Sequence, residues 1–343
     1  MSLPPSGEIP QGAIRFNTDS QKLEFYAQGE WWVMSTDTPN LGRSVDSTPG
    51  PRGVFGRQYT PSILSKIEYL NISTTGSSQE FGDLTIARHA TAGCSSSTRG
   101  IWAGGEGPVP NAVVSRIDYV TISSTGDAIN FGDLDSGRRY VRGVSNETRG
   151  VFAGGIPATS TTIQLITIAS TGSRADFGSI TTIDGATNYV GGATAASSTR
   201  GLYMGAGNPN ETNVIQFVTI HTLGNTQDFG DLTSGGHRSA GGANATRALR
   251  IGQLGSTNVI DYVTIASTGN AQDFGDMPYN CGYNVVMTSP TRAVSTRGYG
   301  GSGYTSDIAY VQIATTGNAA EFGDMGGRNG GDSSGFSNAH GGL

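Results

Sequence analysis

Four histidines are the side chains of this chain best suited to metal binding or to acid–base catalysis near neutral pH. They are His89, His221, His237 and His340. A zinc site needs three or four convergent ligands, and no two of these histidines have the spacing of a ligand pair. No segment has the sequence of a nucleophile elbow. The sequence therefore predicts no metal site, no cofactor and no catalytic residues.

Acidic residues in predicted loops are the other candidates for chemistry, because two carboxylates can hydrolyse a glycosidic bond. They are Glu106, Glu147, Asp184 and Glu211. Isolated acids in loops are usually solvated, and we interpret them in that way. An enzyme that acts on polysaccharide stays open as an alternative.

One short phrase, Phe-Gly-Asp-Leu or a close variant, recurs six times at spacings of 50, 46, 52, 45 and 48 residues. A period near 50 residues is typical of a repeat architecture. Its phenylalanines are predicted to pack between neighbouring repeats, and they are Phe81, Phe131, Phe177, Phe229, Phe274 and Phe322.

Each repeat also carries charged residues at fixed places. The acidic set is Asp83, Asp133, Asp231, Asp276 and Asp324, with Ser179 in the third copy. The basic set is Arg52, Arg99, Arg149, Arg200, Arg247 and Arg292. The matched sets favour ion pairs or charge-assisted hydrogen bonds within or between repeats, in preference to bound calcium.

Four short strands are predicted in each repeat, because β-branched and aromatic residues alternate with turn residues. Examples of the first to fourth strands are 139–144, 149–155, 163–168 and 272–277. A Ser-Thr-Gly turn joins the third strand to the fourth in several copies, where glycine supplies a positive φ. The predicted fold is therefore all-β.

Four antiparallel strands and a Gly-Gly pair after the second strand resemble the blade of a kelch-type β-propeller. The resemblance covers 47–343 and implies a six-bladed propeller, with seven blades as an alternative if an N-terminal hairpin joins the ring. The first blade, 52–84, lacks a good first strand, so we expect 328–336 to complete it. Such closure removes an exposed sheet edge.

Residues 12–34 depart from the repeat and predict a small β-hairpin arm with a third apolar strand, followed by a linker at 35–51. We place the domain boundary between 1–46 and 47–343. A piece of this size has too little core to be stable alone. Its aromatic residues are predicted to mediate assembly, and they are Phe16, Phe25, Trp31 and Trp32.

Composition excludes several classes of protein. The chain has 343 residues, 53 of them glycine, and a net charge of −6 with lysine only at 22 and 66. A nucleic-acid partner requires a basic surface, and no basic stripe occurs. No apolar run is long enough for membrane insertion, and the N-terminus lacks the pattern of a signal peptide. We expect Cys94 and Cys281 to be small buried residues.

The arm resembles a segment common in phage tail fibres, and the repeat resembles kelch-like proteins of marine and cyanobacterial phages. This resemblance implies a non-enzymatic virion structural protein, assembled in the host cytoplasm, which binds other virion proteins through its arm and forms a homo-oligomer. A tail-fibre subunit that recognises a host glycan or protein is the first hypothesis. A decoration or connector protein without a receptor role is an alternative.

The loops between second and third strands vary most, so they are the predicted receptor-binding surface. Candidate residues on these loops are Tyr59, Asn111, Asn208, Asn210, Glu211 and Tyr304.

Overall fold

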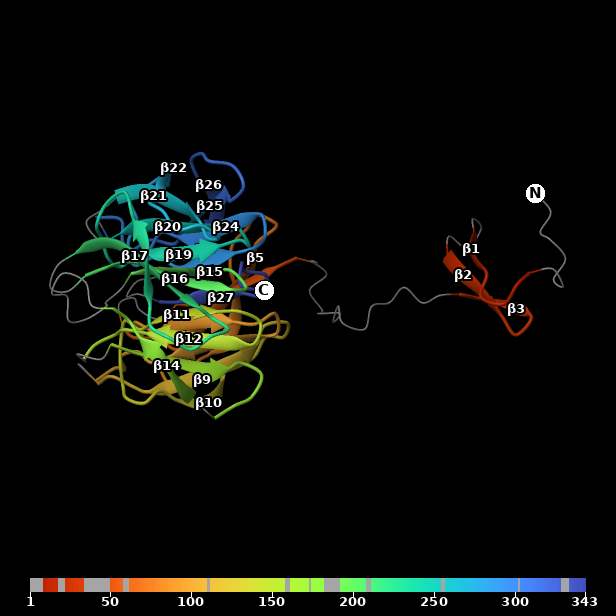
Figure 1. Cartoon of the computed structure of the whole chain (residues 1–343), viewed down its shortest axis with the longest axis horizontal. Helices are drawn as coiled ribbons and strands as arrows, with labels where there is room; N and C mark the ends of the chain where they lie inside the picture. The colour runs from red at the N-terminus through yellow and green to blue at the C-terminus, as the bar shows by residue number, and fades with distance from the viewer. Residues whose placement is uncertain are drawn as a thin grey trace. The chain divides into compact units, whose positions relative to one another are not determined.

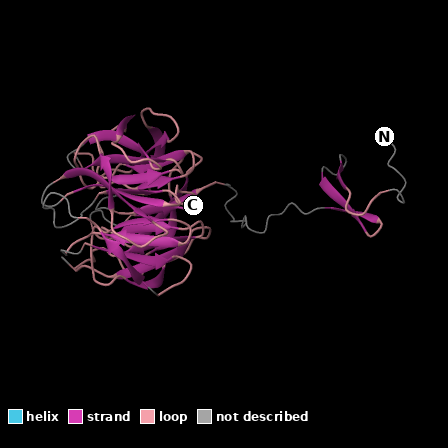
Figure 2. Ribbon diagram, in the orientation of Figure 1, coloured by secondary structure: helices cyan, strands magenta, loops and turns pink. Residues whose placement is uncertain are grey.

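A computed structural model describes most of the chain. The described residues are 9–17, 22–33, 50–57, 62–109, 112–157, 161–172, 174–181, 192–207, 211–253, 257–301, 303–327 and 333–343. They form an all-β structure, without helices over these ranges (Figure 2). The chain divides into two compact units, Met1–Ser47 and Thr48–Leu343.

The first unit contains one three-stranded antiparallel sheet, here called the arm sheet. Its strands, in spatial order, are β1 (Ile14–Asn17), β2 (Lys22–Ala27) and β3 (Glu30–Val33). The predicted turn between its first two strands lies largely outside the described residues.

The second unit contains six four-stranded antiparallel sheets, and Figure 1 shows their strands. Sheet 1 consists of β27 (Gly335–Ser337), β4 (Arg52–Gly56), β5 (Lys66–Asn71) and β6 (Gln79–Asp83). Sheet 2 consists of β7 (Ala92–Ser95), β8 (Arg99–Ala103), β9 (Arg116–Thr121) and β10 (Ile129–Asp133). Sheet 3 consists of β11 (Arg142–Ser145), β12 (Arg149–Ala153), β13 (Thr162–Thr167) and β14 (Arg174–Ser179).

The remaining sheets follow the same order along the chain. Sheet 4 consists of β15 (Ala193–Ala196), β16 (Arg200–Ala206), β17 (Thr212–Thr219) and β18 (Gln227–Asp231). Sheet 5 consists of β19 (Ala240–Ala243), β20 (Arg247–Gln253), β21 (Thr257–Thr264) and β22 (Gln272–Asp276). Sheet 6 consists of β23 (Val286–Thr288), β24 (Arg292–Thr296), β25 (Asp307–Gln312) and β26 (Ala320–Asp324).

The first strands of the six sheets contact one another in a cycle. β7 contacts β11, and the contacts continue through β15, β19 and β23 to β27, which contacts β7 again. Six apolar clusters lie between successive sheets, and the last of them joins sheet 6 to sheet 1. The six phenylalanines of the repeated phrase are buried in these clusters, as the sequence predicted.

The strand that completes sheet 1 comes from the C-terminal end of the chain. β27 pairs antiparallel with β4, so that Gly335 lies opposite Phe55 and Ser337 opposite Gly53. The strand therefore covers 335–337 instead of the predicted 328–336, of which 328–332 lie outside the described residues. Phe336 fills the space over Gly100 in sheet 2, where an added Cβ would lie 1.8 Å from its ring.

Neighbouring sheets are joined at their outer edge by the repeated phrase. The Gly126 amide donates to the Phe81 carbonyl at 2.8 Å, and the Asp83 amide donates to Asp127 Oδ1 at 3.0 Å. A Cβ on Gly82 would lie 2.3 Å from the Gly126 carbonyl, so only glycine allows this approach. The same amide-to-carbonyl bond recurs as Gly224–Phe177, Gly269–Phe229, Gly317–Phe274 and Gly76–Phe322.

The repeated arginines bind the next sheet through carbonyl groups. Arg99 Nη1 donates to the carbonyls of Ile168 at 3.1 Å and Ala169 at 2.8 Å, and its guanidinium lies 4.8 Å from the Tyr119 ring centre. Equivalent bonds to an isoleucine carbonyl of the following sheet are Arg52–Ile122, Arg149–Ile220, Arg200–Ile265, Arg247–Ile313 and Arg292–Ile72.

These bonds are charge-assisted hydrogen bonds between repeats, one of the two interactions predicted for the matched charges, but their acceptors are carbonyl groups instead of the aspartates of the phrase. The aspartate side chains instead accept from serines of their own sheet, as Asp83 does from Ser65 at 2.7 Å and Asp133 from Ser115 at 2.8 Å. A carbonyl at a strand end is an unpaired acceptor, so a guanidinium there forms a charge-assisted bond without a second charge. Ser179 retains the backbone bond to the next sheet through Asn225 Oδ1 at 2.9 Å, which explains how it replaces aspartate.

A row of polar residues lies inside the apolar third strands. The residue that directly follows the isoleucine of each third strand is buried, and this row is Glu68, Asp118, Gln164, Gln216 and Asp261, with Ala309 in sheet 6. Asp118 binds Arg88 at 2.7 Å, and both side chains are fully buried. Such pairs need complete hydrogen bonding, because an isolated buried charge is costly. Sequence reasoning missed this row, although a polar residue inside an apolar strand was a usable signal.

Candidate functional site

Strand order separates two sets of connections in the second unit. The short turns after first and third strands lie at one end of the sheets, here called the turn face. The loops after second and fourth strands lie at the other end, here called the loop face. Because the turns are nearly identical and the loops differ, the loop face is the candidate site.

A polar cavity of about 50 Å³, here called the mouth chamber, lies where the first strands begin at the loop face. Residues from several sheets line it, among them Thr91, Arg142, Ser239, Asn284, Ser333 and Ser334. Asn284 and Ser239 are each 4% exposed. Asn284 Nδ2 donates to the Ile251 carbonyl at 3.1 Å and to Ser295 Oγ at 3.0 Å, which fixes the orientation of the amide.

Two polar atoms of the mouth chamber lack a hydrogen-bond partner among the described residues: Asn284 Oδ1 and Ser239 Oγ. Leaving a buried polar atom unpaired costs about 1–3 kcal/mol, so both atoms favour an external partner. On the opposite side, Thr91 Oγ1 and Ser334 Oγ lie 2.9 Å apart across two sheets.

Aromatic side chains gather around Tyr283, the residue that precedes Asn284 in the chain. The Tyr283 ring lies 6.4 Å from Tyr304, which lies 5.3 Å from Tyr299, and both pairs are T-shaped. The Arg238 guanidinium lies 4.6 Å from the Tyr283 ring and 5.5 Å from that of Tyr140. These side chains are partly exposed. We call Tyr283, Tyr299 and Tyr304 the tyrosine platform.

The backbone beside the mouth chamber adopts an uncommon conformation. Tyr140, Arg238 and Tyr283 have φ of 60°, 54° and 55°, in the left-handed region that non-glycine residues rarely occupy. The Tyr283 amide donates to the Arg238 carbonyl at 2.9 Å, which ties the two loops together. Ala90, at the equivalent place before the first strand of sheet 2, has a φ of 56°, so this conformation belongs to the repeat.

Two loop acids considered as glycosidase residues are already paired. Glu106 forms an ion pair with Arg139, and its carboxylate lies 3.9 Å from His89 Nε2. Glu211 binds His237 Nδ1 at 2.9 Å. Asp184 lies outside the described residues, and Glu147 binds Ser97 at the turn face.

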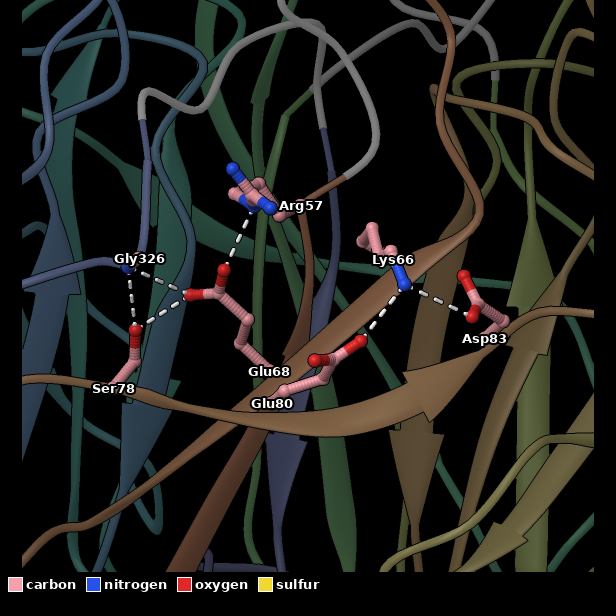
Figure 3. Close-up of polar contacts among 7 residues, drawn as sticks. All are labelled: Arg57, Lys66, Glu68, Ser78, Glu80, Asp83 and Gly326. Carbon is pink, nitrogen blue, oxygen red and sulfur yellow. Dashed lines mark hydrogen bonds and ion pairs between the residues drawn. The ribbon is translucent and has the colours of Figure 1, made fainter.

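A second charged cluster, drawn in Figure 3, includes Lys66 between Glu80 at 2.8 Å and Asp83 at 3.1 Å. Hydrogen bonds to Glu80 and Asp83 raise the pKa of Lys66, and the bond from Ser65 lowers the pKa of Asp83. Both shifts stabilise the ionised forms. Neither group is therefore tuned toward proton transfer at neutral pH.

Figure 3 also shows the polar contact that joins sheet 6 to sheet 1. Glu68 forms an ion pair with Arg57, whose Nε lies 2.7 Å from its carboxylate, and accepts hydrogen bonds from Ser78 Oγ at 2.5 Å and from the Gly326 amide at 3.2 Å. Every oxygen of this buried carboxylate is engaged, so the geometry supports a structural role.

The C-terminal residues lie at the other end of the first strands, at the turn face. A cavity of about 70 Å³, the tail chamber, is lined by the later residues of the first strands and by His340. His340 Nε2 lies 3.0 Å from the Ser95 carbonyl, and its Nδ1 accepts from the Gly342 amide at 3.0 Å. These bonds require a neutral imidazole that is protonated on Nε2 alone.

Acidification should therefore loosen this end of the chain. Burial lowers the pKa of His340 below its ordinary value of about 6.5, so the unfolded chain binds the proton more readily. We expect the neutral His340 side chain to stabilise the folded state fully above pH 6.5. This stabilisation should be lost as the pH falls below that value. Thermal melts between pH 7.5 and 5.5 measure this, and His340→Gln should reduce the pH dependence. An unchanged pH profile in the variant would contradict the assignment.

The two cysteines are free and buried, as predicted. Burial raises the pKa of Cys281 to about 12 and that of Cys94 further still. The thiolate, which is the nucleophilic form, is thus disfavoured at neutral pH.

The structure describes two of the six predicted receptor-loop residues. Tyr304 belongs to the tyrosine platform, and Glu211 is paired with His237. The other four, Tyr59, Asn111, Asn208 and Asn210, lie outside the described residues. Sequence reasoning missed Ser239, Asn284 and Tyr283, since they lie before first strands, in loops that had not been selected.

The predicted assembly residues separate onto two faces of the arm sheet. Phe16 and Trp32 are 59% and 49% exposed, and Ile14 beside them is 63% exposed. Phe25, paired with Ile14 and Trp32, is partly buried on that same face. Trp31 instead packs on Tyr26 at 5.3 Å and under Arg15 at 4.1 Å on the other face.

No protein-family model matches the chain, and neither does any curated protein. Within the described ranges, His, Cys, Asp and Glu form no group of three or more that could hold a metal ion. No helix long and apolar enough to cross a membrane occurs in that part of the chain.

Proposed function

We propose that the second unit is a six-bladed β-propeller of the kelch-like type, in which sheets 1 to 6 are the blades. The cyclic contacts of the first strands support this, as do the six inter-sheet clusters. The arginine-to-carbonyl bonds run in the same direction around the ring and return from Arg292 to Ile72. β27 supplies the innermost strand of the first blade and so closes the ring.

Our functional proposal is a non-enzymatic structural subunit of a phage virion, most simply a tail-fibre or appendage subunit. The observation that carries it is the contrast between the two faces. The turn face repeats one pattern, whereas the loop face combines varied loops with the tyrosine platform and an unsatisfied polar chamber. A rigid scaffold with one diversified face is a common design for recognition.

The arm sheet is the proposed attachment and oligomerisation element. Ile14, Phe16 and Trp32 form an exposed apolar face on a sheet that has little core of its own. Burial of such a face against other virion proteins, or against copies of this chain, would stabilise it. Several copies on one particle would raise avidity for a host surface without new contacts.

Two variants test this division of roles. Deletion of residues 1–46 should leave a folded propeller that is absent from purified phage particles. Replacement of 108–111 by Gly-Ser-Gly-Ser should leave particle assembly intact and reduce adsorption to host cells. Immunogold labelling of particles and adsorption counts provide the measurements.

Three results would contradict the proposal. These are a particle that lacks the chain altogether, an arm deletion that is still incorporated, and release of sugars from host glycans by the purified chain. The last result would favour an enzyme that acts on polysaccharide. Particles that contain the chain but adsorb normally with the replaced loop would favour a decoration or connector role.

A further inference from the structure

We infer that the mouth chamber binds one hydroxyl group of an uncharged saccharide, whose ring rests on the tyrosine platform. This inference rests on the proposed function, because it specifies the ligand of the same loop face.

The hydrogen-bonding pattern selects a hydroxyl group. The Asn284 amide nitrogen donates to the Ile251 carbonyl and to Ser295 Oγ, so the atom left without a partner is the amide oxygen Oδ1. An amide oxygen can only accept a hydrogen bond. Ser239 Oγ can donate as well as accept. A ligand hydroxyl can donate to Asn284 and accept from Ser239 at once. A carboxylate offers no donor for Asn284, and an ammonium offers no acceptor for Ser239.

The chamber has room for a polar group of a ligand. A volume of about 50 Å³ is open to the centres of water-sized spheres, and one water molecule needs about 10–15 Å³ on this measure. A hydroxyl or hydroxymethyl group therefore fits. In the free protein, water can occupy this position, and a ligand hydroxyl would reproduce its bonds.

The tyrosine platform suits the part of the ligand that stays outside. Asn284 follows Tyr283 directly, so the chamber and the platform are adjacent in the chain. Tyr299 and Tyr304 extend the aromatic surface from Tyr283. Tyrosines offer apolar faces beside polar edges, which complement the C–H faces and hydroxyl edges of a sugar ring. Two cations are close by: Arg142 lines the chamber, and Arg238 lies over Tyr283 and Tyr140.

Ser239→Ala is the test variant. It removes a hydroxyl group that has no partner in the described structure, so the melting temperature should stay unchanged or rise slightly. The full chain is applied to an array of neutral and acidic oligosaccharides, and the best neutral ligand is then titrated by NMR. We expect about ten-fold weaker binding by Ser239→Ala, the equivalent of one hydrogen bond of about 1.4 kcal/mol. Tyr304→Leu should also weaken binding, whereas Ser124→Ala at the turn face should have no effect.

Equal binding by Ser239→Ala, binding of acidic glycans only, or no binding to the array would overturn the inference. If the wild-type chain still mediates adsorption to host cells in any of these cases, the proposed attachment function stands and only the ligand assignment fails. If the chain is absent from particles, the proposed function fails whatever the array shows.

Discussion

Removal of residues 333–343 should abolish the folded second unit, with aggregated protein as the product. The deletion takes away β27 and leaves β4 as an unpaired edge next to sheet 2. It also removes Phe336, which is 4% exposed and whose ring centre lies 4.5 Å from that of Trp102. The Trp102 indole, which donates to the Ser334 carbonyl at 3.3 Å, would lose its partner as well.

The expected loss in the free energy of unfolding is large compared with the total stability of a folded domain. Truncation of one buried phenylalanine to alanine costs about 3–5 kcal/mol, whereas whole domains are stable by about 5–15 kcal/mol. Phe336→Ala should therefore lower the melting temperature strongly, and the deletion should leave no cooperative transition. Circular dichroism melts and size-exclusion chromatography measure both outcomes.

A chain that ends at residue 338 is the matched control, because it retains β27 and Phe336 while it loses His340. It should fold cooperatively, with a melting temperature at pH 7.5 lowered only by the loss of the His340 bonds. If the 333–343 deletion melts like this control, the C-terminal strand does not close the ring.

The second large effect is expected at the buried Arg88–Asp118 pair. Arg88→Met leaves the Asp118 carboxylate buried, and among the described residues its remaining hydrogen-bond partner is Thr85, whose Oγ1 lies 2.7 Å away. Breaking a buried pair from one side typically costs about 3–5 kcal/mol, because the remaining charge cannot be solvated. Burial lowers the pKa of Arg88, although the nearby Asp118 carboxylate acts in the opposite direction. The direction of this shift agrees with a guanidinium group that has lost its contact with solvent.

Two comparisons make this prediction specific. The double variant Arg88→Met/Asp118→Leu should recover most of the loss, since no charge is left unpaired. Lys66→Met breaks the exposed pairs with Glu80 and Asp83, and it should cost less than about 1 kcal/mol. Urea unfolding curves measure all three free energies. An Arg88→Met loss no larger than that of Lys66→Met would contradict the buried-charge argument.

The sequence alone predicted the parts of the fold that depend on local patterns. Alternating β-branched residues, Ser-Thr-Gly turns and the Phe-Gly-Asp phrase predicted repeated antiparallel strands with buried phenylalanines, and the six four-stranded sheets agree with that pattern. These features follow from side-chain periodicity and turn chemistry within about 50 residues of chain. The free, buried cysteines were predicted for the same reason.

Partners across sheets could not be read from the sequence. Arg99 and Asp133 recur in step, which favoured an ion pair or a charge-assisted hydrogen bond, and the acceptors that Arg99 finds are carbonyls of the following sheet. The buried carboxylates of the third strands obtain arginines from three different places: Arg57 after a second strand, Arg88 before a first strand and Arg250 within a second strand. Equivalent positions in the repeat thus reach the same charge balance through different segments, because packing between sheets decides which side chain is near.

The mouth chamber depends on tertiary structure to a still greater degree. Thr91, Ser239 and Asn284 lie in separate repeats, and no sequence spacing relates them to a shared cavity. They meet because the first strands of all six sheets contact one another in a cycle. The conformation of the Tyr283 backbone and the bonds that fix the Asn284 amide then determine which atoms remain free to bind. Local patterns specify each strand, but the distance between two polar atoms from different repeats is set only when the whole cycle of sheets has packed.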